Sequence, residues 1–289
     1  MNGIVLKIAR KSTHIPYNQL PIYILLGKHA KILYLCRMES LSVIVITQNE
    51  ADKIRDCLES VSWADELIIV DGGSTDNTIA ICREFTSHVL ENPWPGYAAQ
   101  KQFALDHATK SWVLSIDSDE RLSDPLVQEI KALLANPEAE FDGYYIPRLS
   151  SFLGKPIRYG GWYPGYQLRL FRRDKTTVRQ SRVHEGFLVN GKCGHLKYDM
   201  IHDTHTTIES SLVRMNRYST LEAEDRWESG RVRNVTWGSI IVHPLSAFLR
   251  QFLHLRGYRD GMHGFILALV TAMVKMALYI KLWERQQSN

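Results

Sequence analysis

Short apolar runs alternate with amphipathic segments through the first half of the chain, and this alternation constrains the fold more than any other feature. Residues 42–47 read SVIVIT, a β-branched run typical of a strand that is buried on both faces of a sheet. Residues 66–71 (ELIIVD) and 112–117 (WVLSID) are runs of the same kind, and residues 124–135 show helical spacing. Strands separated by helices predict an α/β fold with a mostly parallel sheet and right-handed crossovers.

The segments between these strands carry the start signals of helices. After the first strand, Ile54, Leu58 and Val61 fall at helical spacing. Asn49 stands where its side chain could cap that helix. A Gly turn followed by Ser, Thr and Asp predicts a second helix within residues 72–85.

Polar and acidic side chains follow three of the predicted strands where each strand ends. Thr47 and Glu50 follow the first strand, and Asp71 ends the second. Asp117 and Asp119 end a later one. Ligands of parallel α/β sheets bind at the carboxyl ends of the strands. Solvated strand ends would carry mixed charges, so acids at all three indicate a binding site.

Asp117 and Asp119 are two residues apart, and residues so spaced point the same way in an extended chain. Two such carboxylates can hold one divalent cation, and Mg²⁺ fills its other positions with phosphate oxygens and water. An EF-hand loop is excluded because Arg121 and Leu122 stand where it needs a ligand and a Gly. Arg121 also breaks a phosphatase motif, whereas a sugar-nucleotide transferase remains compatible.

Composition narrows the class of partner. The chain has 289 residues with 35 Lys and Arg against 31 Asp and Glu, and a net charge of +4 is too weak to indicate a nucleic-acid partner. Its four cysteines form no CxxC pair and no metal-ligand spacing, which is typical of reduced thiols in a cytosolic protein. They are Cys36, Cys57, Cys82 and Cys193.

Four segments within residues 41–150 resemble the inverting family 2 glycosyltransferases. They read VIVITQNE, LIIVDGGSTD, GYAAQKQFAL and WVLSIDSDE, in the order and at the spacing of that family. The resemblance implies a GT-A fold, a UDP-sugar donor and Mg²⁺ or Mn²⁺ as the cofactor. It implies donor-binding roles for six side chains: Asp71 on the uracil, Thr47 and Glu50 in the nucleoside pocket, Lys101 near the base or diphosphate, and Asp117 and Asp119 on ribose, metal and diphosphate.

Segments of the second half resemble the bacterial lipopolysaccharide core glucosyltransferases. They lie in residues 160–173, 182–188, 201–219 and 256–265. That subgroup adds glucose to an inner-core heptose of lipopolysaccharide. The resemblance therefore implies a lipid-linked glycan acceptor and a peripheral protein at the cytoplasmic face of the bacterial inner membrane.

Sugar transfer requires a carboxylate that takes the proton of the attacking hydroxyl group. Glu185 in the stretch VHEG follows the predicted donor half, and we expect it to be this base. The alternative for Glu185 is a surface ion pair with Arg182 or Arg179. His202 could complete the metal shell beside Asp117 and Asp119.

Three further residues are candidates for acceptor binding. Trp162 and Tyr163 suit a platform on which a sugar ring stacks, with core packing as the alternative. Arg169 could hold a phosphate group, with a solvated surface position as the alternative.

The chain is predicted to divide into four parts. Residues 1–37 form an N-terminal extension, 38–150 the nucleotide-sugar-binding half, 151–235 the acceptor and catalytic half, and 236–289 an amphipathic helical region. For the extension we expect either that Met38 is the natural start or that a basic-aromatic arm faces a membrane.

The C-terminal region is predicted to dock on a membrane surface. Residues 261–274 are uncharged, but a spanning helix needs roughly 20 apolar residues. Basic and aromatic residues precede this run, a pattern typical of segments that lie in the interface of anionic membranes. The alternative is a helical pair packed on the protein's own core.

Four other functions share part of this pattern. A polyprenyl-phosphate glycosyltransferase, or another cell-surface polysaccharide glycosyltransferase, would share the first 150 residues. A nucleotide-sugar sensor would keep the donor pocket but need no base. A membrane-associated scaffold would bind no nucleotide.

Overall fold

The computed structural model describes most of the chain from residue 39 onward. The described ranges are 39–136, 140–179, 186–204, 207–232 and 234–288, preceded by the short strands β1 (Leu6–Lys7), β2 (Tyr23–Leu26) and β3 (His29–Lys31). The two alternatives for the N-terminal extension, Cys36 and the predicted base Glu185 lie outside the described residues. Cys57, Cys82 and Cys193 are free, as predicted.

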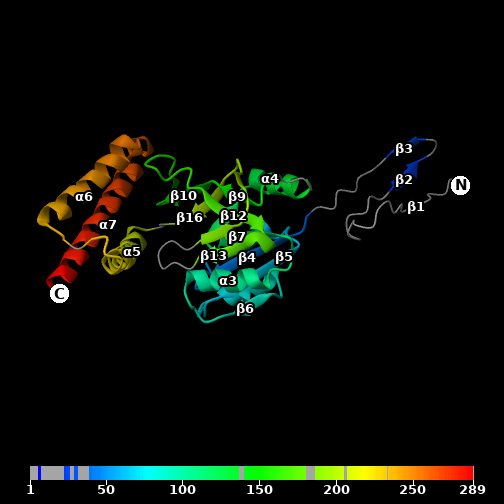
Figure 1. Cartoon of the computed structure of the whole chain (residues 1–289), viewed down its shortest axis with the longest axis horizontal. Helices are drawn as coiled ribbons and strands as arrows, with labels where there is room; N and C mark the ends of the chain where they lie inside the picture. Colours follow the sequence, from blue (N-terminus) through cyan, green and yellow to red (C-terminus); the bar gives the residue numbers. More distant parts are fainter. Residues whose placement is uncertain are drawn as a thin grey trace.

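A mixed sheet, seven-stranded within the described residues, forms the centre of the molecule (Figure 1). Its order is β15-β9-β12-β7-β4-β5-β6. The bounds are β4 (Leu41–Thr47), β5 (Glu66–Asp71), β6 (Val89–Glu91), β7 (Trp112–Asp117), β9 (Gly143–Ile146), β12 (Gln167–Arg172) and β15 (Cys193–His195). The strands from β7 to β6 are parallel, which confirms the predicted α/β fold, whereas β12 runs antiparallel to both β7 and β9.

Helices cover both faces of this sheet because its central strands are apolar on both sides. They are α1 (Ile54–Val61), α2 (Thr78–Phe85), α3 (Tyr97–His107) and α4 (Asp124–Leu134). On β4, Val43 and Val45 pack with α1, α2 and α4 in one buried cluster. Ile44 and Ile46 point to the other face and pack with α3. The carboxyl ends of β4, β5 and β7 are thus left as an open edge between two layers.

The helix predicted after β4 is confirmed, but Asn49 does not cap it. Lys53 is the N-cap residue of α1. Asn49 instead has a φ of +55°, and its Oδ1 accepts a hydrogen bond from the Thr75 backbone N–H at 2.8 Å. Asn49 therefore ties the loop after β4 to the loop after β5, and both loops border the strand ends.

A second, smaller sheet lies beside the first. Its order is β11-β10-β16-β8, with β8 (Glu120–Leu122), β10 (Arg148–Phe152), β11 (Lys155–Pro156) and β16 (Met200–Asp203). β13 (Thr176–Arg179) and β14 (Gly186–Val189) pair separately. In the second sheet, His202 is the register partner of Ser150 on one side and of Glu120 on the other. This register brings the second half of the chain to the acids that follow β7.

Long helices follow at one end of the molecule (Figure 1). They are α5 (Ile208–Glu228), α6 (Trp237–Leu249) and α7 (Met262–Gln287), with the π-helical turn η3 (Arg250–His254) and the 3-10 turn η4 (Gly257–Asp260) between α6 and α7. α7 packs along both α5 and α6. It continues well past the uncharged run at its start, and among the described helices it alone is long and apolar enough to cross a membrane, with a mean hydropathy of 1.9.

Candidate functional site

A cavity of about 1290 Å³ lies at the carboxyl ends of β4 and β7. Thr47, Glu50 and Lys101 line it, as do the paired acids Asp117 and Asp119. Parts of α5 and α7 form another portion of its wall. Pockets for one small ligand usually measure about 300–1,000 Å³, so this cavity has room for a donor and the end of an acceptor.

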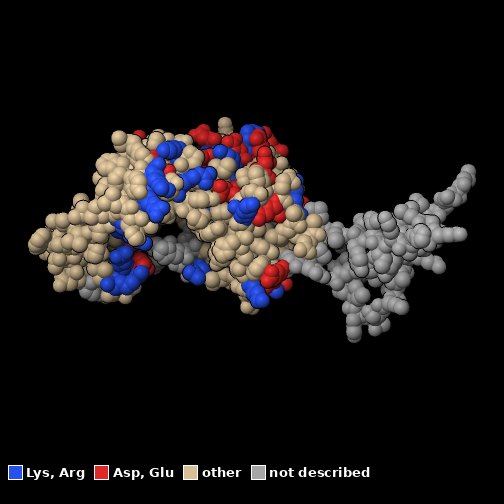
Figure 2. All heavy atoms as spheres, turned by 90° about the horizontal axis from the view of Figure 1, so that it is seen from above, with Lys and Arg blue, Asp and Glu red and all other residues tan. Residues whose placement is uncertain are grey.

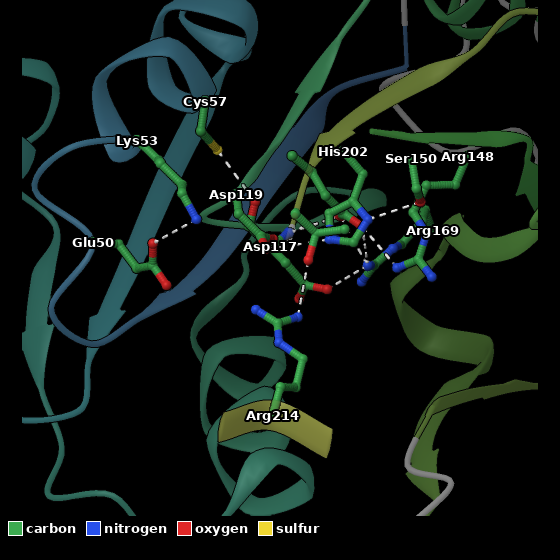
Figure 3. Close-up of polar contacts among 12 residues, drawn as sticks. Glu50, Lys53, Cys57, Asp117, Asp119, Arg148, Ser150, Arg169, His202 and Arg214 are labelled. Carbon is green, nitrogen blue, oxygen red and sulfur yellow. Dashed lines mark hydrogen bonds and ion pairs between the residues drawn. The ribbon is translucent and has the colours of Figure 1, made fainter. Parts of the chain in front are cut away.

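Asp117 lies between two cations of the protein itself. Lys101 Nζ is 3.3 Å from Asp117 Oδ1. Arg169 Nη2 donates to Asp117 Oδ2 at 2.5 Å (Figure 3). Burial alone would raise the pKa of Asp117, but the charges of Arg169 and Lys101 outweigh it and hold the pKa well below its usual range. Asp117 is therefore ionised, and part of the positive charge that the acidic strand end requires comes from these two side chains.

Glu120, to which the sequence assigned no role, holds both Arg169 and the backbone of Asp117 in place. Its side chain is 0% exposed and accepts hydrogen bonds from Arg169 Nη2 at 2.8 Å and from the Asp117 backbone N–H at 3.0 Å. Arg148 Nη1 lies 3.3 Å from the same carboxylate. The signal for Glu120 was a third acid three residues after Asp117, but its burial is not visible in the sequence.

Arg169, which is predicted to hold an acceptor phosphate, lines the cavity but is only 4% exposed. Its guanidinium is held by Asp117 and Glu120. Burial alone would lower its pKa, but the two carboxylates outweigh burial and raise it. Arg169 therefore positions Asp117, and its acceptor role stays a prediction.

Asp119, in the turn between β7 and β8, faces His202 on β16 (Figure 3). His202 Nε2 is 3.2 Å from Asp119 Oδ2, and Ser150 Oγ is 2.9 Å from His202 Nδ1. Burial alone would raise the pKa of Asp119, but the hydrogen bond and charge of His202 outweigh it and lower the pKa. The prediction placed Asp119 and His202 in one site, and the structure brings them together.

This pair fits a divalent cation by its donor chemistry. A carboxylate oxygen and an imidazole nitrogen lie side by side, and the second ring nitrogen is oriented by Ser150, as metal-binding histidines usually are. Within the described ranges no group of three His, Cys, Asp or Glu side chains is gathered as a metal site. Donor phosphate oxygens and water would supply the remaining ligands, as is usual for Mg²⁺.

Thr47 and Glu50 also lie on the cavity wall. The Thr47 hydroxyl is buried and has no hydrogen-bond partner within the described part of the chain, so a bound donor group can satisfy it. Burial raises the pKa of Glu50, and Lys53, 3.8 Å away, only partly offsets this effect.

Asp71 is buried at the end of β5, and its predicted contact with uracil stays a prediction. It has no exposed surface and is not among the described residues that line the cavity. Its carboxylate accepts hydrogen bonds from the backbone N–H groups of Gly73 at 2.8 Å and Ser74 at 2.7 Å, and from the Ser74 hydroxyl at 2.5 Å. In this structure Asp71 folds the loop after β5.

Two aromatic residues that sequence reasoning missed line the cavity. Trp94 and Tyr97 pack edge to face with ring centroids 4.9 Å apart. Gly72 makes room for Trp94, because a Cβ at Gly72 would approach Trp94 Cε3 to 2.5 Å. The stretch WPGY, which leads into α3, was the signal, and flat rings in the cavity wall suit the stacking of a nucleotide base.

The two residues of the predicted aromatic platform, Trp162 and Tyr163, lie in different surroundings. Trp162 lines the cavity and packs edge to face on Phe152 with centroids 6.5 Å apart. Tyr163 does not belong to the described lining. Its hydroxyl donates to Asp199 Oδ1 at 2.9 Å, and the Arg158 guanidinium lies 5.2 Å from its ring centroid. Of these two residues, only Trp162 lines the cavity as the structure describes it.

Arginines from later elements line the same cavity. They are Arg179 at the end of β13 and Arg214 and Arg217 on α5. Arg214 points toward the acids in Figure 3, and its Nη1 donates to Thr204 Oγ1 at 3.0 Å. Within the described residues, none of these three arginines is within ion-pair distance of a carboxylate. Sequence reasoning did not single out the α5 pair.

The strand-end cavity, the acid pair and the α/β layers define an enzyme of the GT-A fold, and comparisons with known proteins give its family. Residues 42–185 match the family model described as glycosyl transferase family 2. The lipopolysaccharide core biosynthesis glycosyltransferase LpsC of Rhizobium meliloti is 32% identical over 252 residues, which cover 85% of this chain and 92% of that protein. The chain belongs to glycosyltransferase family 2.

Two further proteins show the range of similarity. An uncharacterized glycosyltransferase of Rickettsia felis is 30% identical over 259 residues, covering 86% of this chain and 90% of that protein. The crystal structure of S. aureus TarS 1–349 in complex with UDP-GlcNAc is 14% identical, covers 86% of this chain and 92% of that chain, and has a TM-score of 0.44. Similarity at that score carries no argument about substrate.

Proposed function

We propose that this protein transfers glucose from a UDP-sugar to an inner-core heptose of lipopolysaccharide, with inversion of the anomeric carbon. The observation that carries the donor part is Asp119 beside His202 at the carboxyl ends of parallel strands, in a cavity also lined by Lys101 and Trp94. The acceptor part is supported by the relative LpsC, whose name assigns it to lipopolysaccharide core biosynthesis and most of whose length this chain matches.

Asp119 and His202 are the proposed ligands of Mg²⁺ or Mn²⁺. The sequence suggested Asp117 and Asp119, but Lys101 and Arg169 already neutralise Asp117. Asp117 is instead assigned to the donor's ribose, whose hydroxyl groups can donate to an ionised carboxylate. When bound, the divalent cation supplies charge neutralisation for the departing diphosphate. Arg214, which lines the same cavity, adds fixed positive charge from the protein.

Glu185 is the proposed general base. The chain segments on either side of residues 180–185 end in Arg179 and Gly186, and both of these residues line the cavity. A carboxylate there would take the proton of the attacking hydroxyl while Trp162 holds the acceptor sugar. Asp199 and Asp203, the next acids along the chain, are engaged, because Asp199 accepts from Tyr163 and Asp203 pairs with Arg121.

The donor proposal is tested by replacing a metal ligand. Asp119→Ala is expected to abolish the difference in UDP affinity between Mn²⁺ and EDTA and to weaken binding in Mn²⁺ by about tenfold or more, since a metal ligand is lost. Titration calorimetry measures both values. Asp203→Ala is the matched control, because Asp203 lies next to His202 in sequence but pairs with Arg121. Equal wild-type affinity for UDP in Mn²⁺ and in EDTA would contradict the metal assignment.

The acceptor proposal is tested by following labelled sugar. Purified protein is incubated with labelled UDP-glucose and lipopolysaccharide from a strain that lacks the gene, and the product glycan is analysed. Label in the inner core is the expected result. Label that extracts with polyprenyl lipids would identify the alternative acceptor, and absence of turnover with any donor would favour a nucleotide-sugar sensor.

A further inference from the structure

α6 exposes a row of large apolar side chains. Trp237 is 79% exposed and Leu245 is 55% exposed, and Ile241 and Leu249 continue the row at four-residue spacing. Residues four apart lie on the same face of a helix. No Lys, Arg, Asp or Glu occurs from Trp237 to Leu249. This face of α6 is therefore apolar along its whole length.

α7 carries a second exposed row that joins the first. Its members, spaced three or four residues apart, are Met262, Phe265, Leu269, Met273, Met276, Ile280 and Trp283. Phe265 packs edge to face on Phe248 of α6 at 5.8 Å and on Phe252 of η3 at 5.6 Å. Phe248 is next to Leu249 of the first row, so these contacts bring the two rows together near the turn between α6 and α7. We call the exposed side chains of both rows the C-terminal apolar face.

The C-terminal apolar face is too large to be an ordinary exposed patch. Single exposed apolar residues are common, but contiguous patches of this extent mark a site for a membrane or a partner. Figure 2 shows the end of the molecule formed by α6 and α7 as a largely uncharged surface, with Lys and Arg gathered where it meets the rest of the protein.

Polar contacts bind the opposite side of α7 to α5. Lys275 Nζ lies 3.1 Å from Glu222 Oε1, and Arg285 Nη2 lies 2.9 Å from Glu224 Oε1. Lys281 Nζ bonds to Ser219 Oγ at 2.8 Å. If α7 crossed a bilayer, it would have to leave these partners or carry the charged α5 into hydrocarbon, and charges at the bilayer centre are costly. α7 is therefore built to lie along a membrane.

The turn between α6 and α7 is basic. Arg250, Arg256 and Arg259 are exposed there, and no ion pair links them to a carboxylate anywhere in the described ranges. Tyr258 is also exposed beside them. Arginines and a tyrosine at the border of an apolar face suit anionic lipid head groups, which attract basic residues electrostatically. This charge favours an anionic bilayer over a second copy of the chain, whose equivalent border would carry like charge.

α7 also belongs to the wall of the candidate active site. Val270 and Val274 line the cavity. Val270 follows Leu269 of the apolar face directly in sequence, and Val274 follows Met273. One position along a helix corresponds to a rotation of about 100° around its axis. One side of α7 thus faces the cavity and the neighbouring side belongs to the apolar face.

We propose that the C-terminal apolar face docks in the plane of an anionic lipid bilayer, with α6 and α7 lying on the membrane and not across it. The cavity then opens within about one helix diameter, roughly 10 Å, of the head groups. An acceptor can be reached while its lipid anchor stays in the bilayer, provided that the accepting sugar is close to that anchor. The docking itself does not depend on which sugar or acceptor the enzyme uses.

Vesicle flotation of the full chain tests the docking. Wild-type protein is expected to float with vesicles of phosphatidylcholine and phosphatidylglycerol, less with phosphatidylcholine alone, and less at high salt. Leu245→Glu and Leu269→Glu should each lower the vesicle–water partition coefficient of the protein by about tenfold or more. Each variant loses a Leu side chain that the bilayer would bury and places a charge there instead. Leu188→Glu is the matched control, since Leu188 is similarly exposed on β14, and it should bind like wild type. Equal losses in all three variants would overturn the proposal.

Two further measurements cover the other outcomes. The double variant Arg250→Gln and Arg259→Gln should fold normally and lose the preference for anionic vesicles, which keeps the test valid if a Glu variant unfolds.

A C-terminal peptide tag should be cut by protease added outside vesicles that carry bound protein. A protected tag would mean that α7 crosses the bilayer. A dimer in solution that the Leu variants dissociate, without vesicle binding, would assign the face to a second copy. Either result overturns in-plane docking.

Discussion

Glu185→Gln is expected to slow sugar transfer by about 10²–10⁴-fold, the usual contribution of a general base. Gln keeps the shape and the hydrogen-bonding capacity of Glu but cannot accept the proton of the acceptor hydroxyl. UDP affinity should change little, because donor binding is assigned to Asp117, Asp119 and Trp94. Initial rates at saturating substrates, together with UDP titration, separate the two effects.

Glu50→Gln is the matched control for this loss. Glu50 lies on the cavity wall, and its raised pKa makes it the described carboxylate most suited to act as a base in place of Glu185. A large loss in Glu50→Gln with a rate for Glu185→Gln within about threefold of wild type would transfer the role of base to Glu50. If Glu185 only pairs with an arginine, its Gln variant should keep most activity or lose stability and binding together.

Arg169→Met is expected to lower the free energy of unfolding by about 3–5 kcal/mol, the range found when one partner of a buried ion pair is removed. Arg169 is almost fully buried between Asp117 and Glu120, so its loss leaves two carboxylates short of a cation. Denaturant titration measures the change. Adding Glu120→Gln should recover part of the loss, because it removes one of the uncompensated charges.

Arg55→Met is the control for charge removal alone. Arg55 pairs with Glu84 at 2.9 Å on the surface, and exposed pairs contribute only about 0–1 kcal/mol. Similar small losses in the Arg55 and Arg169 variants would show that the network around Asp117 does not stabilise the fold.

The stability difference between wild type and Arg169→Met should depend on pH. The pKa of Asp117 in the folded protein lies below its ordinary value of 3.8. Its ion pairs therefore stabilise the fold above that value, and this contribution is lost as the pH falls below about 4 toward the folded-state pKa. We expect the difference in unfolding free energy to be constant near neutral pH and to narrow in acid. A difference that widens in acid would contradict this account of Asp117.

The fold of the donor half and the position of its acids could be predicted from the sequence. β-branched apolar runs and helical periodicity are local patterns, and the chirality of crossovers then brings the carboxyl ends of β4, β5 and β7 to one edge. For the same reason Thr47, Asp117 and Asp119 were predicted at one site before any contact was known. The resemblance to family 2 rests on segments from this half.

Partners far apart in the sequence could not be predicted. Arg169 is 52 residues from Asp117, and no local pattern distinguishes an arginine that binds a buried carboxylate from one that binds substrate. Asp71 was placed at the correct strand end, but its burial depends on the turn through Gly73 and Ser74. Trp94 has a role in the cavity only because Gly72, on another loop, leaves room for its ring.

The sequence by itself determined which side chains stand at the strand ends and which helix faces are apolar, because both follow from residue spacing along one element. The tertiary structure decided which residues each of these side chains contacts and which of the apolar faces are buried. The register of β16 set His202 beside Asp119, and α5 covered one side of α7 while leaving the C-terminal apolar face open. Such outcomes depend on the packing of elements distant in the chain, because burial and pairing depend on the neighbours of a side chain as well as on its type.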